Sequence, residues 1–413
     1  MKDNLERRLL ALKAAGGAIT FGTGLLQPIV FSRHLTTSEL AYLFTFLGIV
    51  TYLSLFDAGA GRAFYITIRE KYVAKSDYKA TFALSSLFFV ALAIVLLVSF
   101  SLTSHVLARR FQLYGAGWTP AYTIFSLLIT LFALYRPIFY ATDRQILYDI
   151  LDVMKRLISL VLVIVLFLLG MYAACAIACL LALVVIGPVA KSVLRGFAAW
   201  PGVRNLNSQK PTIGLVGHSL VYSIAEISIY NFGYFVMPFS FSEKEVVIFG
   251  FLMRFYLMLT LIVRVFGDVF LHRFSQHIHS SQHEAAEGVF YKAQLLSTGT
   301  ALALGIGFFA FGNTLLDVWV DGYAFTNADI AFVSLMVVAN SILHVSGAFA
   351  GVTKAGLVIT KRISVPTAVA IVALFLFGPS VLDLSGVLYG YLFIYAVFSV
   401  STFVAFYLKV LKK

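Results

Sequence analysis

The chain alternates long apolar stretches with short polar connections. A helix needs about 20 apolar residues to cross the hydrocarbon core of a bilayer, and twelve stretches approach that length. They lie at 14–32, 40–61, 82–104, 120–140, 156–170, 172–190, 213–238, 246–271, 292–312, 329–352, 363–381 and 385–408. Gly170 is the only break between the fifth and the sixth. The pattern predicts an all-α polytopic membrane protein of about twelve transmembrane helices, the first of them uncleaved.

The longest polar connection, near 191–212, falls almost at mid-chain and contains Trp200-Pro201-Gly202. It separates six predicted spans from another six, as in transporters that are built from two parallel repeats. We therefore expect an N-terminal six-helix bundle over 1–200, a cytoplasmic linker over 201–212, and a pseudo-symmetric C-terminal six-helix bundle over 213–413.

The positions of Lys and Arg predict the orientation of the chain. With the N-terminus in the cytoplasm, 25 of the 31 basic residues fall in cytoplasmic segments and four in outer loops, as the positive-inside rule expects. Both termini are then cytoplasmic, in a bacterial inner membrane. The net charge of +12 meets anionic lipid headgroups on that face, so binding to nucleic acid is not needed to explain it.

Composition and motifs exclude several classes of protein. Hydrophobic residues make up 60% of the chain and charged residues 12%, against roughly 25% charged residues in a soluble domain. No connection has room for a soluble catalytic or nucleotide-binding domain, and the motifs GxxxxGKS/T, HExxH and GxSxG are absent. We expect no enzyme activity and no cofactor. Cys175 and Cys179 are interpreted as small packing residues, and no metal site is expected.

Charged residues inside the eighth span are the main functional signal. Arg254, Arg264 and Asp268 fall within an arc of roughly 80° on an ideal helix. An Arg near the centre of a span costs roughly 2.5–3.5 kcal/mol on insertion scales, so it usually faces a wet cavity or a partner. We interpret the two Arg residues as a ladder of positive groups that binds an anion. The alternative is that they extend to the headgroups or stabilise helix packing.

The seventh span carries a second polar face. Tyr222, Glu226 and Tyr230 share an arc of roughly 100°, with His218 at its cytoplasmic edge. A carboxyl at the depth of Glu226 is a candidate proton carrier; alternatively it is permanently paired with an Arg of the eighth span. His344 in the tenth span is a weaker candidate, and a hydrogen bond explains it as well as a proton relay does.

Local motifs resemble the polysaccharide repeat-unit flippases of the MOP exporter superfamily, which include the O-antigen translocases. The matching segments are Gln27-Pro28 with Arg33, the stretch 35–42 (LTTSELAY), the stretch 56–62 (FDAGAGR), and the stretch 242–245 (SEKE) that leads into 249–251 (FGF). The architecture covers the whole chain. At residue level the stretch 56–62 carries over only at Asp57, Gly59 and Arg62.

The resemblance implies a V-shaped fold with a cavity that opens alternately to each side. The implied cargo is an oligosaccharide joined by diphosphate to a polyprenyl lipid, moved from the cytoplasmic to the periplasmic leaflet for lipopolysaccharide or other polysaccharide biosynthesis. Other polysaccharide-assembly proteins would be partners, and ion-coupled antiport is implied. The candidate substrate-binding residues are Arg254, Arg264, Tyr222, Tyr230, Tyr234, Arg33 and Arg62. The candidate ion-coupling residues are Glu226, Asp268, Asp57, His344 and His218.

Two other functions remain open. A cation-coupled, MATE-like exporter of small amphipathic compounds would have the same fold, although a lumen for cationic drugs should be rich in carboxylates and this one is rich in Arg. A membrane-embedded enzyme that modifies glycans would need a His-Asp or paired-carboxylate set at one membrane surface.

Overall fold

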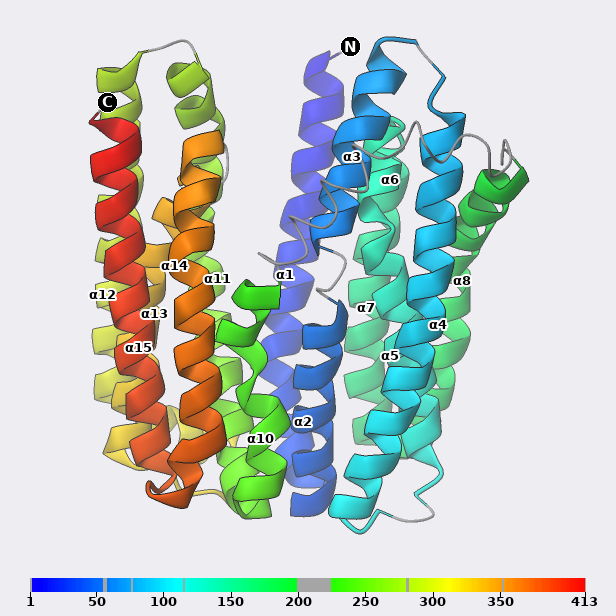
Figure 1. Cartoon of the computed structure of the whole chain (residues 1–413). Coiled ribbons are helices and arrows are strands. Elements are labelled where there is room, and N and C mark those ends of the chain that lie inside the picture. The colour runs from blue at the N-terminus through cyan, green and yellow to red at the C-terminus, as the bar shows by residue number, and fades with distance from the viewer. Residues whose placement is uncertain are drawn as a thin grey trace. The chain divides into compact units, whose positions relative to one another are not determined.

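The computed structural model describes residues 2–54, 58–75, 77–113, 116–198, 224–279, 282–350 and 353–412, and almost all of them are helical (Figure 1). The chain divides into two compact units, Met1–Ile224 and Ala225–Lys413. The predicted linker 201–212 lies outside the described residues.

In unit 1 the described parts of the first six predicted spans are helical, except at Tyr135 and Gly170. The helices are α1 (Lys2–His34), α2 (Thr37–Ser54), α3 (Ala58–Val73), α4 (Lys79–Arg110), α5 (Trp118–Leu134), α6 (Arg136–Ala141), α7 (Gln145–Leu169) and α8 (Met171–Ala198). Helix α1 packs on α7, α7 packs on α8, and α8 also contacts α4 and α5. Gly170 separates α7 from α8 as expected, and its φ of +85° explains why glycine stands there.

Two helices of unit 1 extend beyond the apolar stretches. Helix α3 includes residues 62–73, which the hydropathy pattern assigns to a cytoplasmic connection. Helix α7 begins at Gln145, eleven residues before the predicted span at 156. The added turns mix polar and apolar residues, and tertiary packing buries part of them, including Ile68 on α3 and Tyr148 and Leu151 on α7.

The core of unit 1 includes an aromatic cluster between α2, α4 and α5. Tyr42 stacks on Phe46 with ring centroids 5.6 Å apart and meets the edge of Trp118 at 5.3 Å. Phe46 also contacts Phe100 and Tyr122. These side chains are almost fully buried, so they fix how the three helices are rotated against one another.

Unit 2 begins with a helical segment over residues 225–231 and continues as a second set of helices. They are α10 (Gly233–Ser240), α11 (Glu243–His279), α12 (His283–Trp319), α13 (Asn327–Ala350), α14 (Lys354–Phe377) and α15 (Leu384–Phe406), followed by a π-helical turn over Tyr407–Leu411. Helix α13 packs against α11, α12 and α15. A cluster of phenylalanines from α11, α12, α13 and α15 forms one buried core: Phe274, Phe290, Phe349 and Phe406.

Capping boxes start three of the helices. At α2 the Glu39 carboxylate accepts hydrogen bonds from the backbone N–H and the hydroxyl of Thr36. At α11 Glu245 does the same for Ser242. The Ser/Thr-x-x-Glu pattern satisfies N–H groups that would otherwise lack partners. Helices α2 and α11 therefore start in the same way. Helix α13 starts similarly, because the Asp329 carboxylate accepts hydrogen bonds from the backbone N–H and the hydroxyl of Thr326.

Among the described residues, eight helices are long and apolar enough to cross a membrane: α4, α5 with α6, α8, α11, α12, α13, α14 and α15. The protein is therefore a multi-pass membrane protein. Within unit 1 the start of α1 lies at the same end as α3 and α6, and within unit 2 the C-terminus lies at the same end as the last turns of α11 (Figure 1).

Candidate functional site

Helix α11 places both membrane-embedded arginines in unit 2. It runs from the capping box at Ser242 through Arg254 to Arg264, and most of its length is a candidate membrane span. Both Arg side chains are partly buried. The Nε of Arg264 is buried without a hydrogen-bond partner, and no ion pair of Arg264 is found among the described side chains. A guanidinium with an unused N–H group is therefore held inside the unit.

The middle of α11 contributes to a buried cluster that consists of tyrosine hydroxyl groups and one asparagine amide. The amide nitrogen of Asn340 on α13 donates to the hydroxyl of Tyr256 at 2.5 Å and to that of Tyr395 at 2.9 Å. The Tyr395 hydroxyl donates to that of Tyr230 at 3.4 Å. Asn340, Tyr256 and Tyr395 are at most 1% exposed. The Oδ1 atom of Asn340 is buried without a partner, so the cluster retains one unused acceptor.

Arg264 lies within electrostatic reach of three of the surrounding side chains: Tyr230, Tyr256 and His344. His344 also bonds to the Arg264 backbone. Gly267, one turn beyond Arg264, lets the His344 ring approach α11, because a Cβ built at that position would stand 3.0 Å from the ring. The structure thus brings together Arg264, Tyr230 and His344, which are far apart in the sequence.

Glu226 and Arg254 lie near other predicted residues of the same unit. Glu226 is exposed, and it interacts electrostatically with Tyr230, one turn further along the same helical segment. Arg254 interacts in the same way with Tyr234. Tyr234 is 8% exposed, and its ring packs edge-on against Phe249 at 5.0 Å. Tyr230 therefore presents more of its ring than Tyr234 does.

The remaining predicted residues belong to the other unit or have side chains outside the description. Arg33 is exposed at the end of α1, in unit 1. Arg62 lies on α3 and Asp268 on α11, but the side chains of both are outside the described set. Three candidates, Asp57, His218 and Tyr222, lie outside the described residues altogether.

Sequence reasoning missed two members of the cluster, Tyr256 and Tyr395. A signal for the second was present, because Tyr391, Tyr395, Ser399 and Thr402 recur at helical spacing along α15 and all are buried. A buried polar stripe on an otherwise apolar membrane helix indicates a face that meets other polar groups rather than lipid. Tyr256 lies two residues after Arg254, and nothing in the local pattern separates it from a packing residue.

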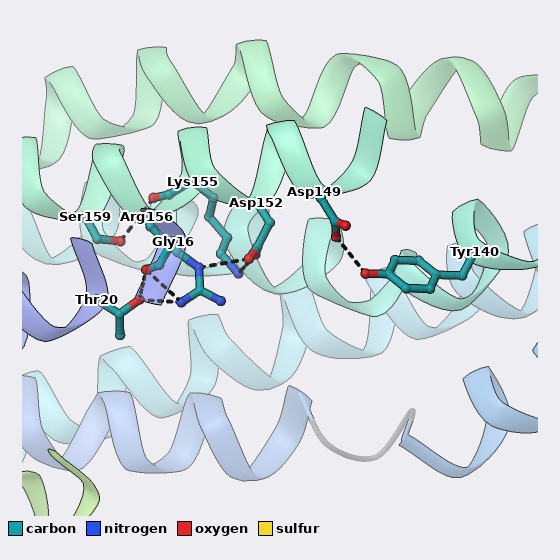
Figure 2. Close-up of polar contacts among 8 residues, drawn as sticks. All are labelled: Gly16, Thr20, Tyr140, Asp149, Asp152, Lys155, Arg156 and Ser159. Atoms are coloured by element: carbon teal, nitrogen blue, oxygen red, sulfur yellow. Dashed lines mark hydrogen bonds and ion pairs between the residues drawn. The ribbon is translucent and has the colours of Figure 1, made fainter. Parts of the chain in front are cut away.

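Unit 1 contains a second polar network, between α1 and α7 (Figure 2). The Asp152 carboxylate pairs with Lys155 at 2.7 Å and with the Nε of Arg156 at 2.8 Å. Arg156 then reaches α1, where its Nη1 donates to the carbonyl of Gly16 at 3.2 Å and to the hydroxyl of Thr20. Asp152 precedes the apolar part of α7. Burial by itself would raise the pKa of its carboxyl, but Lys155 and Arg156 hold that pKa below its usual value.

The sequence pattern assigns Lys155 and Arg156 to a cytoplasmic connection, whereas the structure shows both on α7. Thr20 lies inside the first predicted span, so the Arg156 guanidinium enters the membrane region and ties α7 to α1. One turn before Asp152 on α7, the buried Asp149 accepts a hydrogen bond from the hydroxyl of Tyr140 at 2.6 Å (Figure 2). The second carboxylate oxygen of Asp149 is buried without a partner.

The chemistry that these groups offer is hydrogen bonding and charge pairing. The part of the chain that the structure describes holds no group of three His, Cys, Asp or Glu side chains arranged for a metal ion. The unit 2 cluster offers one guanidinium, several hydroxyls and an unused amide oxygen within a membrane-embedded bundle. Such a set can bind an anion or conduct a proton through hydroxyl groups.

Structures of known transporters resemble the chain. An inward-facing MATE family multidrug resistance transporter of the MOP superfamily has a TM-score of 0.65 and 13% sequence identity, over 96% of this chain and 94% of the other. A mutant of the Vibrio cholerae MATE transporter VcmN has a TM-score of 0.63 and 14% identity, over 100% and 98%. The lipid II flippase MurJ, in an inward closed conformation, has a TM-score of 0.63 and 13% identity, over 97% and 87%.

No protein-family model matches the sequence, and neither does any curated protein. At identities of 13% and 14% the likeness to solved structures shows the fold alone. The chain has the helical membrane-protein fold of the MOP-type transporters.

Proposed function

We propose that the chain is a flippase that moves a lipid-linked, diphosphate-bearing saccharide from the cytoplasmic to the outer leaflet by alternating access. The proposal places it in a bacterial inner membrane with both termini in the cytoplasm, as the distribution of Lys and Arg predicts. An O-antigen or similar polysaccharide repeat unit is the cargo that the sequence motifs favour.

The setting of Arg264 is the observation that carries this proposal. A guanidinium inside a membrane helix is costly unless it has water or a partner. Arg264 interacts electrostatically with Tyr230, Tyr256 and His344, and its Nε has no hydrogen-bond partner. No ion pair of Arg264 is found among the described side chains. The positive charge thus remains available to an anionic ligand.

The chemistry of a lipid diphosphate suits this setting. Arg binds phosphate through a planar fork of N–H donors, and such charge-assisted hydrogen bonds are roughly twice as strong as neutral ones. Sugar rings pack on aromatic faces, and the partly exposed Tyr230 lies within reach of the same Arg. The flippase among the similar structures is described as acting on lipid II, which gives a precedent for lipid-linked cargo on this fold.

Ion coupling is the second part of the proposal, with Glu226 as the proton carrier. Glu226 interacts with Tyr230, and Tyr230 accepts a hydrogen bond from Tyr395. Tyr230 therefore interacts both with the Glu226 carboxyl and with the buried cluster that includes Tyr256 and Tyr395. A Glu226→Gln variant should transport without its normal response to a proton gradient. A variant that responds like the wild type would remove Glu226 from the mechanism.

A reconstituted flipping assay tests the role of Arg264. Vesicles containing the full chain and a fluorescent polyprenyl-diphosphate saccharide report the fraction of cargo that an external quencher reaches over time. Charge-assisted hydrogen bonds are worth about 1.5–3 kcal/mol, so Arg264→Ala should slow flipping by about tenfold to a hundredfold. Lys244→Ala, at the outer end of the same helix, is the matched control and should stay near the wild-type rate. Equal rates in both variants would contradict the proposal.

A second candidate function is export of small amphipathic compounds. The MATE transporters among the similar structures support it, since two of them are described as multidrug resistance proteins. A cationic compound would be repelled by Arg264, so Arg264→Ala should leave export unchanged or raise it. Efflux of a cationic dye from cells, compared between the wild type and this variant, distinguishes the two functions. Dye efflux by the wild type, with no cargo flipping in vesicles, would favour the exporter.

A further inference from the structure

Helices α12 and α13 of unit 2 form an apolar groove with a volume of about 350 Å³. That volume lies within the range of small-molecule sites, roughly 300–1,000 Å³. On α12 its wall is a stripe at i, i+3, i+4 and i+7: Leu302, Gly305, Ile306 and Phe309. On α13 the wall is a second stripe with the same spacing: Ala331, Ser334, Leu335 and Val338. Stripes of this spacing follow one face of each helix, so the groove runs along the helix axes for roughly 10 Å.

The floor of the groove is made by small residues and its rims by large ones. Gly305 allows the two helices to meet, because a Cβ there would lie 3.1 Å from the backbone oxygen of Ser334. Ser334 is buried, and its hydroxyl donates to the carbonyl of Ile330 at 2.9 Å, so it presents no unused polar group. Ile306 and Phe309 on the rims are 69% and 58% exposed. The groove therefore offers only hydrocarbon to whatever occupies it.

A polar pair closes one end of the groove. Asn313 continues the α12 stripe and Asn327 continues the α13 stripe, and the Nδ2 of Asn313 donates to the Oδ1 of Asn327 at 2.7 Å. Both side chains are exposed. The second N–H of Asn313 and both N–H groups of Asn327 remain as donors. An apolar groove that ends in exposed amide donors is the profile of a site for an amphipathic molecule.

The predicted topology places this site in the outer leaflet. Residues 302–309 occupy the second half of the ninth predicted span, which runs outward, and residues 331–338 occupy the first half of the tenth, which runs inward. The two asparagines then lie at the outer membrane surface. The chain of an outer-leaflet lipid would enter the groove directly from the bilayer, with its headgroup beside the amide pair.

The charge around the amide pair selects among headgroups. The connection 313–328 contains Asp317 and Asp321, both exposed, and no Lys or Arg. An anionic lipid would be repelled there. A zwitterionic lipid with an amine can accept hydrogen bonds from Asn313 and Asn327 through its phosphate and donate from its ammonium to Asp317.

We propose that unit 2 binds one zwitterionic, amine-bearing phospholipid of the outer leaflet, with a hydrocarbon chain in the α12–α13 groove and the headgroup at the Asn313–Asn327 pair. This site lies on different residues from the Arg264 cluster and does not depend on the proposed flippase function. Its occupant is a resident lipid and not the anionic cargo.

Native mass spectrometry of the full chain tests the proposal. The protein is equilibrated in nanodiscs of equal amounts of phosphatidylethanolamine and phosphatidylglycerol, released, and scored for retained lipid. The wild type should retain phosphatidylethanolamine in preference. Ala331→Phe, which fills the groove, should lower that retention by about tenfold, equivalent to about 1.4 kcal/mol. Ala303→Phe, at an exposed position of α12 that does not line the groove, is the matched control and should retain lipid as the wild type does.

A second pair of variants keeps the test decisive. If Ala331→Phe does not yield folded protein, Leu335→Trp fills the same groove from a rim position that is 50% exposed. Replacing Asp317 and Asp321 by Lys should reverse the headgroup preference without reducing the amount of bound lipid. Equal retention in the groove-filled and control variants would overturn the proposal. So would a wild-type preference for phosphatidylglycerol, or for a polyprenyl diphosphate that is added to the same nanodiscs.

Discussion

Removing Asn340 should measure how far the buried hydroxyl cluster stabilises unit 2. The amide of Asn340 donates two hydrogen bonds, to Tyr256 and Tyr395, and the side chain is 1% exposed. A net hydrogen bond contributes about 1 kcal/mol in soluble proteins and averages about 0.6 kcal/mol in double-mutant cycles within a membrane protein. The two bonds are therefore worth about 1–2 kcal/mol together, and Asn340→Ala should cost at least that, with a further cost for the space it leaves.

Denaturation of the purified chain in mixed micelles gives the free energy of unfolding. The Asn340→Ala, Tyr395→Phe and double variants form a cycle that isolates one of the two bonds, with an expected coupling energy of about 0.6–1 kcal/mol. Thr402→Val is the matched control, because the hydroxyl of Thr402 is buried without a partner, so its loss should be neutral or stabilising. A coupling energy near zero would refute the reasoning. So would a Thr402→Val variant as unstable as Asn340→Ala.

Glycine and capping positions provide the remaining predictions. A Cβ at Gly16 would stand 3.3 Å from Arg156, so Gly16→Ala should displace the guanidinium from α1 and lower thermal stability by about 1 kcal/mol. Gly17→Ala meets nothing within 4 Å and should instead raise stability by up to about 1 kcal/mol through helix propensity. Gly170→Ala should cost about 1–2 kcal/mol in the same thermal assay, because φ is +85°. Ser242→Ala should remove about 1 kcal/mol from the α11 cap, seen as faster hydrogen exchange in its first turn.

Each of these predictions has a result that would count against it. Equal stability of Gly16→Ala and Gly17→Ala would mean that Arg156 does not hold α1 to α7. A Gly187→Ala variant, at a helical glycine with nothing within 4 Å, is the control for Gly170. If the two variants lose stability equally, the left-handed backbone at Gly170 is not the cause. Unchanged hydrogen exchange in Ser242→Ala would show that water replaces the cap.

The sequence alone was enough to locate the apolar part of the helices, but not the full extent of α3 and α7. Hydrophobic length identifies membrane spans because a bilayer has a fixed thickness, and almost all described residues of the predicted spans are helical. Gly170 and the capping boxes at Thr36 and Ser242 mark ends of elements through short-range chemistry, which a single stretch of sequence contains. Arg254 and Arg264 stand out for the same local reason, as charges within apolar stretches.

Only the tertiary structure decided which faces of the helices meet. Asn340, Tyr256 and Tyr395 come together from α13, α11 and α15, and Arg156 reaches from α7 into α1. The apolar groove between α12 and α13 likewise exists only when both helices are in place. In a soluble protein the apolar face of a helix shows which side is buried. In a membrane the lipid-facing and buried faces are both apolar, so the pattern of hydrophobic residues does not determine how each helix is rotated. Close packing at small residues and the pairing of a few polar groups determine it instead.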